Sequence, residues 1–241
     1  MAPFATVPLL SVTSATPRSR LLTLDVSASP LTFVPGQAVV IGDHSQAARR
    51  PYSIACSPEQ AALRGTIDLL IGLDATGAPG PHLPSLAPGA AIDIEGPIGT
   101  FILPEPLSRG PLLFVGGGTG IAPLRSMIDH AIRTRPTIQL ALLYSARRAD
   151  EFAFIDELRD HARAGRLELH QTVTRDDEDW RGNRGRIGRS HFEAVLHEPG
   201  RTLCFVCGPA AMVSDAVVTL AQLGVARHAV RTERWTGRSP D

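Results

Sequence analysis

The stretch that most constrains this fold is residues 111–125, where a short apolar run ends in glycines before a helical pattern begins. Residues 112–115 are apolar throughout, as in a strand buried on both faces, and residues 116–120 supply four glycines and one threonine. Where a strand ends in glycines and a helix follows, backbone N–H groups and the helix N-terminus converge on an anion. The stretch therefore indicates a phosphate cradle.

The glycine spacing departs from the usual dinucleotide fingerprint, G-x-G-x-x-G. After Gly116 and Gly118, the position of the third glycine is held by Ile121. Taken alone, the loop is compatible with either a ligand site or a tight strand-to-helix turn, so the rest of the chain has to decide between them.

Composition narrows the classes of protein. A hydrophobic content of 43% with 22 glycines and 20 prolines in 241 residues is typical of a globular chain with many turns, long enough for two small domains. The formal net charge of zero does not favour a nucleic-acid binder. All 24 basic residues are arginines, which excludes mechanisms that need a lysine amine, such as Schiff bases and Walker-type P-loops.

Three cysteines are too few for a four-thiolate iron–sulfur cluster, and the odd count argues against a disulfide framework. The spacing of Cys204 and Cys207 matches C-x-x-C in form, but Cys204 lies within an apolar run, so we interpret it as core packing and expect no metal site. No apolar stretch is long enough for a signal peptide or a membrane span. We expect a soluble, cytoplasmic protein with no membrane insertion.

The first part of the chain has the sequence pattern of short β-strands separated by turns. Six short segments with turn residues between them predict a closed antiparallel barrel or a sandwich. The predicted strands are residues 7–13, 20–26, 38–41, 52–56, 66–73 and 90–94.

From Pro111 onward, apolar strands alternate with helical patterns, which predicts a parallel sheet with helices on both faces and ligands at the carboxyl ends of its strands. The predicted strands are residues 112–115, 139–144, 167–173, 203–206 and 228–231; the predicted helices are residues 123–134, 150–164, 189–195 and 209–223. The boundary falls near residues 106–110, so we expect domains at 1–107 and 108–241.

The motif Arg50-Pro51-Tyr52-Ser53 begins one of the barrel strands. A guanidinium can pair with phosphate, an aromatic ring can stack on a flat heterocycle, and a hydroxyl can hydrogen-bond a ring nitrogen. The alternative is a proline-initiated strand with an exposed arginine and a half-buried tyrosine.

Five motifs follow one another in the order and spacing of the ferredoxin-NADP reductase superfamily, which the chain resembles from about Val7 to Trp235. They lie at residues 50–53, 96–101, 116–123, 207–209 and 233–235. The resemblance implies an N-terminal antiparallel six-stranded β-barrel that binds flavin. It also implies a C-terminal, Rossmann-like α/β domain with a parallel sheet that binds NAD(P).

The resemblance implies residue roles as well. Arg50 would bind flavin phosphate, Tyr52 would stack on the isoalloxazine, and Ser53 would hydrogen-bond near N5. The turn at residues 117–120 would receive the pyrophosphate, with Cys207 beside the nicotinamide and Trp235 over the other flavin face. The expected catalytic residues are Ser53, Cys207, Tyr52 and Glu233. The expected cofactor-binding residues are Arg50, Pro51, Tyr52, Ser53, Gly80, Pro81, His82, Leu83, Gly117, Gly118, Thr119, Gly120, Pro123, Ser145, Arg147, Arg148, Arg175, Cys207, Gly208, Pro209 and Trp235.

One segment departs from the superfamily pattern. Where a Ser or Thr usually precedes an aromatic-Leu pair and binds flavin phosphate, this chain has Gly80-Pro81-His82-Leu83. Gly80 offers only its backbone N–H, which weakens the case for FAD; we expect FAD, with FMN as the alternative. His82 either contacts the ribityl or phosphate part of the flavin or is a surface-loop histidine.

The second strand of the α/β domain is followed by Ser145-Ala146-Arg147-Arg148, where an acidic residue would hold a ribose 2′-hydroxyl. A hydroxyl and two guanidiniums suit a 2′-phosphate, and Arg175 after the third strand could join them, so NADPH is favoured over NADH. The alternative is that Arg148 pairs with Asp150 or Glu151.

A second group of arginines lies in the loop at residues 180–190. Arg181, Arg184, Arg186 and Arg189 either present a basic face to an acidic electron acceptor or form ordinary solvated surface.

The expected function is that of a flavin-dependent oxidoreductase that takes a hydride from NAD(P)H. Electrons would then pass to a separate acceptor such as a ferredoxin, an oxygenase component or a haem protein. The alternatives are a flavin reductase, or a non-catalytic flavin electron-transfer subunit of a larger complex.

Overall fold

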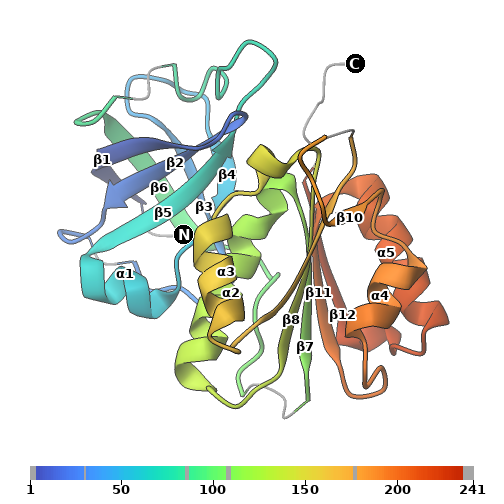
Figure 1. Ribbon diagram of the computed structural model, residues 1–241. Helices are drawn as coiled ribbons and strands as arrows, with labels where there is room; N and C mark the ends of the chain where they lie inside the picture. Colours follow the sequence, from blue (N-terminus) through green and yellow to red (C-terminus); the bar gives the residue numbers. More distant parts are fainter. Residues whose placement is uncertain (1–3, 30, 85–86, 107–109, 176–177, 236–241) are drawn as a thin grey trace. The chain divides into compact units, whose positions relative to one another are not determined.

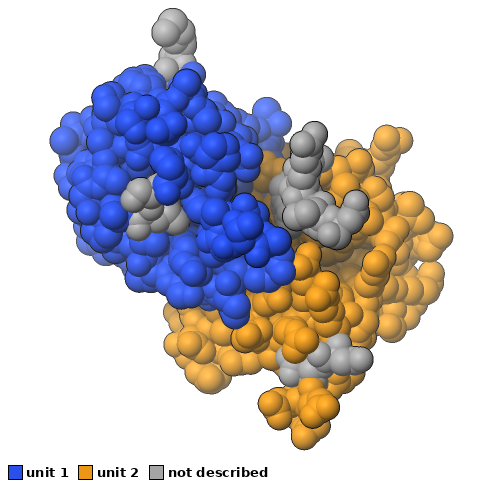
Figure 2. Space-filling model, turned by 90° about the horizontal axis from the view of Figure 1, so that it is seen from above, with its two compact units in different colours: residues 1–103, 125–130, 239–241 blue, residues 104–124, 131–238 orange. Residues whose placement is uncertain are grey.

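The computed structural model describes residues 4–29, 31–84, 87–106, 110–175 and 178–235, except for the side chain of Trp235 (Figure 1). The described residues form two compact units (Figure 2). Residues up to 103 belong to the first unit together with 125–130, and residues 104–124 and those from 131 onward belong to the second.

The first unit is built on a sheet of six antiparallel strands in the order β4-β3-β6-β1-β2-β5. An antiparallel bridge between Ile54 and Leu69 joins the two edge strands and closes the sheet. The predicted six-stranded antiparallel barrel is confirmed. Its strands are β1 (Phe4–Thr16), β2 (Ser19–Asp25), β3 (Ala38–Asp43), β4 (Arg50–Ser53), β5 (Thr66–Gly72) and β6 (Ala91–Ile98).

Every second side chain along the strands is buried, and these side chains fill the core of the barrel. Leu22 and Leu24 of β2 and Ile67, Leu69 and Ile71 of β5 are fully buried in one apolar cluster, as the period of two in a half-buried strand requires. Helix α1 (Pro58–Arg64) lies between β4 and β5 and was not predicted, because seven residues carry too little periodicity to separate a helix from a turn.

The second unit is built on a sheet in the order β10-β9-β8-β7-β11-β12, in which every neighbouring pair is parallel. Helices α4 and α5 cover one face and α3 the other (Figure 1), so the predicted α/β architecture is confirmed. The strands are β7 (Leu112–Gly117), β8 (Leu140–Ala146), β9 (Glu168–Val173), β10 (Asn183–Arg184), β11 (Leu203–Pro209) and β12 (Val230–Trp235). The α-helices that follow β7 in the chain are α2 (Ile121–Thr134), of which residues 125–130 belong to the first unit, α3 (Ile155–Arg163), α4 (Arg189–Val195) and α5 (Ala210–Gln222). Single 3₁₀ turns are η1 (Gly118–Gly120), η2 (Ala149–Glu151) and η3 (Arg227–Ala229).

The helix predicted at residues 150–164 begins later, at Ile155. Phe152 and Ala153 are buried, and Phe154 has a left-handed backbone with φ 59°, so this segment packs against the domain before the helix starts. Strand β10 was not predicted, because two residues paired with Thr172 and Val173 leave no pattern in the sequence. Within the described residues, no helix combines the length and apolarity that crossing a bilayer demands.

Candidate functional site

The motif Arg50-Pro51-Tyr52-Ser53 forms the whole of strand β4. It pairs with β3, where Tyr52 lies opposite Val39 and Arg50 opposite Ile41. Arg50 and Pro51 are exposed, whereas Tyr52 and Ser53 are half-buried. An edge strand of this kind presents a guanidinium, an aromatic ring and a hydroxyl along one short backbone, as the sequence predicted.

Tyr52 is paired with His82, the residue that the sequence left between a flavin contact and a surface histidine. The Tyr52 hydroxyl and His82 Nε2 are 2.8 Å apart, and the two rings stack with centroids 5.6 Å apart at 18°. His82 has no exposed surface, so the surface-loop alternative is wrong. The histidine instead forms part of the wall beside β4.

Both members of this pair are neutral near pH 7. Burial raises the pKa of Tyr52 to about 12. Burial, followed by the positive charge of Arg50, lowers the pKa of His82 to about 4. The contact between them is therefore a hydrogen bond between a phenol and a neutral imidazole, and not an ion pair.

Gly80 lies between the Arg50 guanidinium and the His82 ring. A Cβ built on Gly80 would be 3.3 Å from Arg50 Nη1 and 3.4 Å from His82 Nδ1, and the glycine has a left-handed φ of +107°. His82 Nδ1 is buried and has no hydrogen-bond partner among the described residues. A guanidinium and a buried, unpartnered ring nitrogen around one glycine fit an anionic group such as a flavin phosphate.

The other residues of this segment are held differently. Leu83 is fully buried in the barrel core, and Pro81 is exposed. The Leu83 side chain therefore anchors the segment to the barrel, while the His82 carbonyl accepts a hydrogen bond of 2.8 Å from the backbone of Asp43. These contacts fix where the His82 ring lies.

In the second unit, strand register brings the predicted residues to one edge of the parallel sheet. Cys207 pairs with Gly116 of β7 on one side and with Glu233 of β12 on the other. Gly117 pairs with Ser145, the buried serine near the end of β8. All of these positions are at the carboxyl ends of their strands, where ligands bind in open α/β sheets.

The glycine turn packs closely against the end of β11. A Cβ on Gly120 would lie 2.3 Å from the Cys207 carbonyl oxygen, and one on Gly117 would lie 2.7 Å from Met212 Sδ. Gly118 has a φ of +55° and begins the 3₁₀ turn that leads into α2. Packing within the protein thus accounts for Gly117 and Gly120, and Gly118 and the half-buried Thr119 are the accessible part of the turn. Gly208 and Pro123 are buried, and Pro209 is exposed at the end of β11.

Tyr144 holds this turn in place and was not identified from the sequence. Its hydroxyl donates to the Gly118 carbonyl oxygen at 3.2 Å and accepts from the Ala153 N–H at 3.1 Å. Its side chain is fully buried, so in an apolar strand it resembles ordinary core packing. The available signal was that a buried tyrosine hydroxyl needs polar partners.

The Cys207 thiol lies next to a carboxylate. Its Sγ donates to Glu233 Oε2 at 3.7 Å, and burial together with the charge of Glu233 raises the pKa of Cys207 well above its ordinary value. The thiol is therefore neutral at the sheet edge and acts as a weak donor rather than a thiolate nucleophile. Cys204 is fully buried in the apolar cluster with α4 and α5, which confirms its interpretation as core packing.

Two of the arginines proposed for a 2′-phosphate follow neighbouring strands. The Arg175 N–H donates to the Arg147 carbonyl oxygen at 3.0 Å, so the two residues leave β9 and β8 side by side. Arg147 is half-buried, while Arg148 and Arg175 are exposed. Within the described part of the chain, no ion pair joins Arg148 to Asp150 or Glu151.

The arginines of residues 180–190 are all exposed. Arg184 donates to the Trp180 carbonyl oxygen at 2.8 Å, and Arg189 pairs with Glu193 at 2.8 Å. Trp235 ends β12 with its backbone, and its side chain lies outside the described residues.

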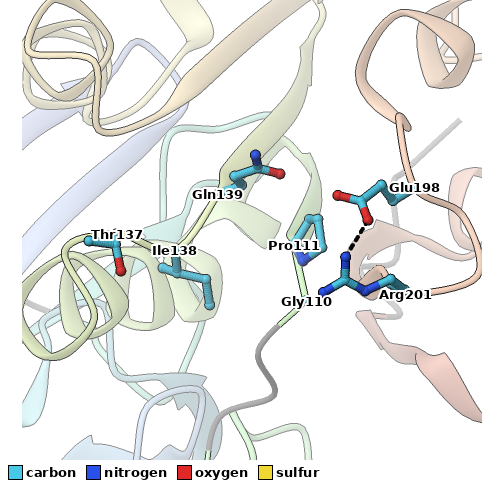
Figure 3. Close-up of a pocket in the computed structure, with 7 residues that line it drawn as sticks. All are labelled: Gly110, Pro111, Thr137, Ile138, Gln139, Glu198 and Arg201. Atoms are coloured by element: carbon cyan, nitrogen blue, oxygen red, sulfur yellow. Dashed lines mark hydrogen bonds and ion pairs between the residues drawn. The ribbon is translucent and has the colours of Figure 1, made fainter.

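An open hollow of about 230 Å³ lies at the amino-terminal edge of the same sheet (Figure 3). Pro111 and Gln139 border it just before β7 and β8, and Glu198 pairs there with Arg201 at 2.6 Å. It therefore lies at the opposite edge from Cys207 and the glycine turn, and its charged groups neutralise each other.

Comparisons with known proteins agree with this geometry. An oxidoreductase FAD-binding domain matches residues 7–102 and an oxidoreductase NAD-binding domain matches residues 114–217. Ferredoxin--NADP reductase B of Sorangium cellulosum (strain So ce56) is 35% identical over 196 residues, which is 78% of either chain.

Two further proteins are similar. The ferredoxin--NAD(P)(+) reductase component of naphthalene 1,2-dioxygenase/salicylate 5-hydroxylase systems in Ralstonia sp is 32% identical over 213 residues, 82% of this chain but 59% of that protein. The crystal structure of the Amycolatopsis cytochrome P450 reductase GcoB has a TM-score of 0.86 at 24% identity, covering 99% of this chain and 72% of the other, which shows the fold alone.

The fold and the matched domains define a flavoprotein oxidoreductase whose cofactors are FAD and a nicotinamide dinucleotide. This confirms the predicted class of NAD(P)H-dependent flavoprotein reductase. The chain belongs to the ferredoxin-NADP reductase superfamily.

Proposed function

We propose that this chain takes electrons from NADPH and passes them through FAD to a separate protein acceptor, an iron–sulfur or haem protein. The similar Sorangium and Ralstonia proteins are named as ferredoxin reductases, which supports an acceptor of this kind. The 241 residues hold three cysteines, fewer than a four-thiolate cluster requires, so the acceptor lies outside them.

The flavin supplies the redox chemistry when bound, since it accepts a hydride from the nicotinamide and releases electrons to an acceptor one at a time. The protein supplies positioning. Tyr52 offers a ring on β4, Ser53 a hydroxyl beside it, and Arg50 and His82 the polar groups for the phosphate part.

At the sheet edge of the second unit, Gly118 and Thr119 in the 3₁₀ turn just before α2 are proposed to bind the pyrophosphate. The neutral Cys207 thiol and the Glu233 carboxylate are proposed to lie beside the nicotinamide. The thiol keeps its proton there and donates it in a hydrogen bond to Glu233, so it does not act as a nucleophile.

The choice of NADPH rests mainly on one observation: Arg147 and Arg175 follow the ends of two neighbouring strands, β8 and β9. Two arginines on neighbouring strand ends, with Arg148 adjacent to one of them and Ser145 near the end of β8, favour a dianionic 2′-phosphate over a pair of ribose hydroxyls. A carboxylate at this point would have favoured NADH.

Charge reversal tests this choice. The double variant Arg147→Glu with Arg148→Glu should raise the KM for NADPH about a hundredfold through loss of charge-assisted hydrogen bonds, and change the KM for NADH much less. The matched control, Arg163→Glu with Arg166→Glu, makes the same charge change at exposed positions near the end of α3 and should leave both values near wild type. Equal increases for the two nucleotides would refute the 2′-phosphate site.

Turnover with ferricyanide as acceptor tests the activity itself. The isolated chain, loaded with FAD, should oxidise NADPH steadily under these conditions. Failure with both nicotinamides would instead favour a non-catalytic electron-transfer subunit.

A further inference from the structure

Strand β12 is an open edge of the parallel sheet (Figure 1). It pairs with β11 along its whole length, and no described strand pairs with its other side. The opposite edge of this sheet, β10, has only two residues, and the bridge between Ile54 and Leu69 joins the edge strands of the first sheet. The backbone N–H and C=O groups along an open edge can pair with a strand of another chain.

This edge lacks two features that commonly prevent such pairing. Residues 230–235 contain no proline, and the ladder with β11 has no bulge. The charged residues of the strand are Arg231, Glu233 and Arg234. Side chains opposite each other in an antiparallel pair attract when their charges differ and repel when their charges match, so the order of these charges decides which strand can pair here.

Side chains of β12 alternate between the two faces of the sheet. Val230 packs in the apolar cluster with α4 and α5, so Thr232 lies on that same face. Arg231 and Glu233 lie on the opposite face, where Glu233 contacts the Cys207 thiol. Thr232 is exposed, and Arg231 and Glu233 are half-buried. Both charged residues therefore keep some surface open at the edge.

A second copy of β12 supplies matching charges. In an antiparallel pair with the two-fold axis at Thr232, Arg231 of each copy lies opposite Glu233 of the other copy, on the same face of the sheet. The two adjacent symmetric registers are centred on Arg231 or on Glu233, and each sets one of these residues opposite itself, where like charges repel. Of the three registers, only the one centred on Thr232 pairs opposite charges.

Helix α5 gives this arrangement further support. A two-fold axis perpendicular to the sheet keeps the faces, so α5 of both copies lies on one face of the joined sheet. Among its thirteen residues, α5 has a single charged one, Asp215. Its exposed residues include Ala211, Ala221 and Val218, and the Val218 side chain is 56% exposed. An apolar outer side is typical of a helix that a partner covers.

We propose that the chain forms a two-fold dimer through β12, in which the two parallel sheets join into one sheet across an antiparallel pair of edge strands. Residues 230–234 of one copy pair with residues 234–230 of the other. Five paired residues from each copy make a small interface, so the dissociation constant should be on the order of micromolar.

Charge exchange tests the pairing. Sedimentation equilibrium of the FAD-loaded full chain should show a concentration-dependent mixture of one chain and two. Arg231→Glu and Glu233→Arg each set like charges opposite each other twice in the dimer, so each should raise the dissociation constant about tenfold or more. The double variant, Arg231→Glu with Glu233→Arg, restores opposite charges and should recover the wild-type equilibrium.

The control is Arg166→Glu, which makes the same charge change at an exposed position after α3 and should leave the equilibrium unchanged. All these variants are compared by mass alone, because Glu233 is also proposed to lie beside the nicotinamide.

A cross-link tests the register. Thr232→Cys places two thiols opposite each other at the axis, where Cα atoms about 4.5–5.5 Å apart suit a disulfide. Under mild oxidation this variant should run as a covalent dimer on a non-reducing gel. The native cysteines are buried, so the new thiol is the reactive one. Ala164→Cys, at an exposed position after α3, should stay a single chain.

Three results would overturn the proposal. The first is a wild-type chain that sediments as one chain at every concentration it reaches. The second is a dimer that Arg231→Glu leaves unchanged, because the copies would then meet at another face. The third is a Thr232→Cys variant that forms no more covalent dimer than Ala164→Cys, and this result decides the question even if the charge variants do not fold.

Discussion

Replacing Gly120 with alanine should break the contact between the glycine turn and the end of β11. The added Cβ would lie 2.3 Å from the Cys207 carbonyl oxygen, 2.7 Å from the Cys207 carbonyl carbon and 2.9 Å from the Gly208 nitrogen. All three are backbone atoms, so no side chain can rotate away. The φ of Gly120 is −62°, which alanine adopts freely, and the substitution therefore tests steric contact alone.

The magnitude follows from the cost of overpacking. Inserting a methyl group into a packed site costs about 1–3 kcal/mol, and obstruction by backbone places Gly120→Ala at the upper end, about 3 kcal/mol. For a chain of this size, that loss corresponds to a fall in Tm of roughly 6–12 °C. Because the turn must shift away from Cys207, the KM for NADPH should also rise.

Scanning calorimetry and steady-state kinetics of the FAD-loaded protein measure both effects. Gly200→Ala is the matched control, since its Cβ would meet nothing within 4 Å and its φ lies outside the left-handed range. Gly200→Ala should change neither quantity appreciably. If Gly120→Ala melts with the control and binds NADPH normally, the turn does not pack on β11 as described.

Two other predictions concern the buried polar groups. Cys207→Ala should lower kcat about tenfold with unchanged flavin content, because Glu233 loses its thiol donor; unchanged turnover would make Cys207 a packing residue. His82 has a pKa of about 4 in the folded chain against 6.5 in the unfolded one, so the unfolded state binds the extra proton, and stability present above about pH 6.5 is lost as the pH falls toward 4. Between pH 7.5 and 4.5, the free energy of unfolding measured with denaturant should fall by about 2.5 kcal/mol less in His82→Phe than in the wild type. Parallel curves for the two proteins would contradict the assignment.

The regular parts of the fold were predictable because burial imposes a period. The alternation in β5 and the continuous apolar run in β7 are direct consequences of facing one or two apolar layers. The left-handed backbone of Phe154 was not predictable from the sequence. The preceding residue, Ala153, is hydrogen-bonded to the Tyr144 hydroxyl, and no local sequence pattern connects these two positions.

The same distinction applies to the candidate site. The chemistry of the side chains was enough to select the motif at β4 and the residues at the sheet edge as candidates. Which of them are neighbours depends on strand register, which places Cys207 beside Glu233. No sequence pattern distinguishes Gly117 and Gly120, which pack against other parts of the protein, from Gly118, which is accessible to a ligand. The pairing of Tyr52 with His82 joins positions that lie 30 residues apart, so it required the closed barrel.

Reduction of the bound flavin tests the central claim most directly. The purified chain is loaded with FAD without oxygen, and NADPH is then added while the visible flavin absorption is followed. The account predicts a yellow protein whose flavin band bleaches rapidly with NADPH and more slowly with NADH. A chain that takes up no FAD, or a flavin band that persists in the presence of both nucleotides, would contradict it.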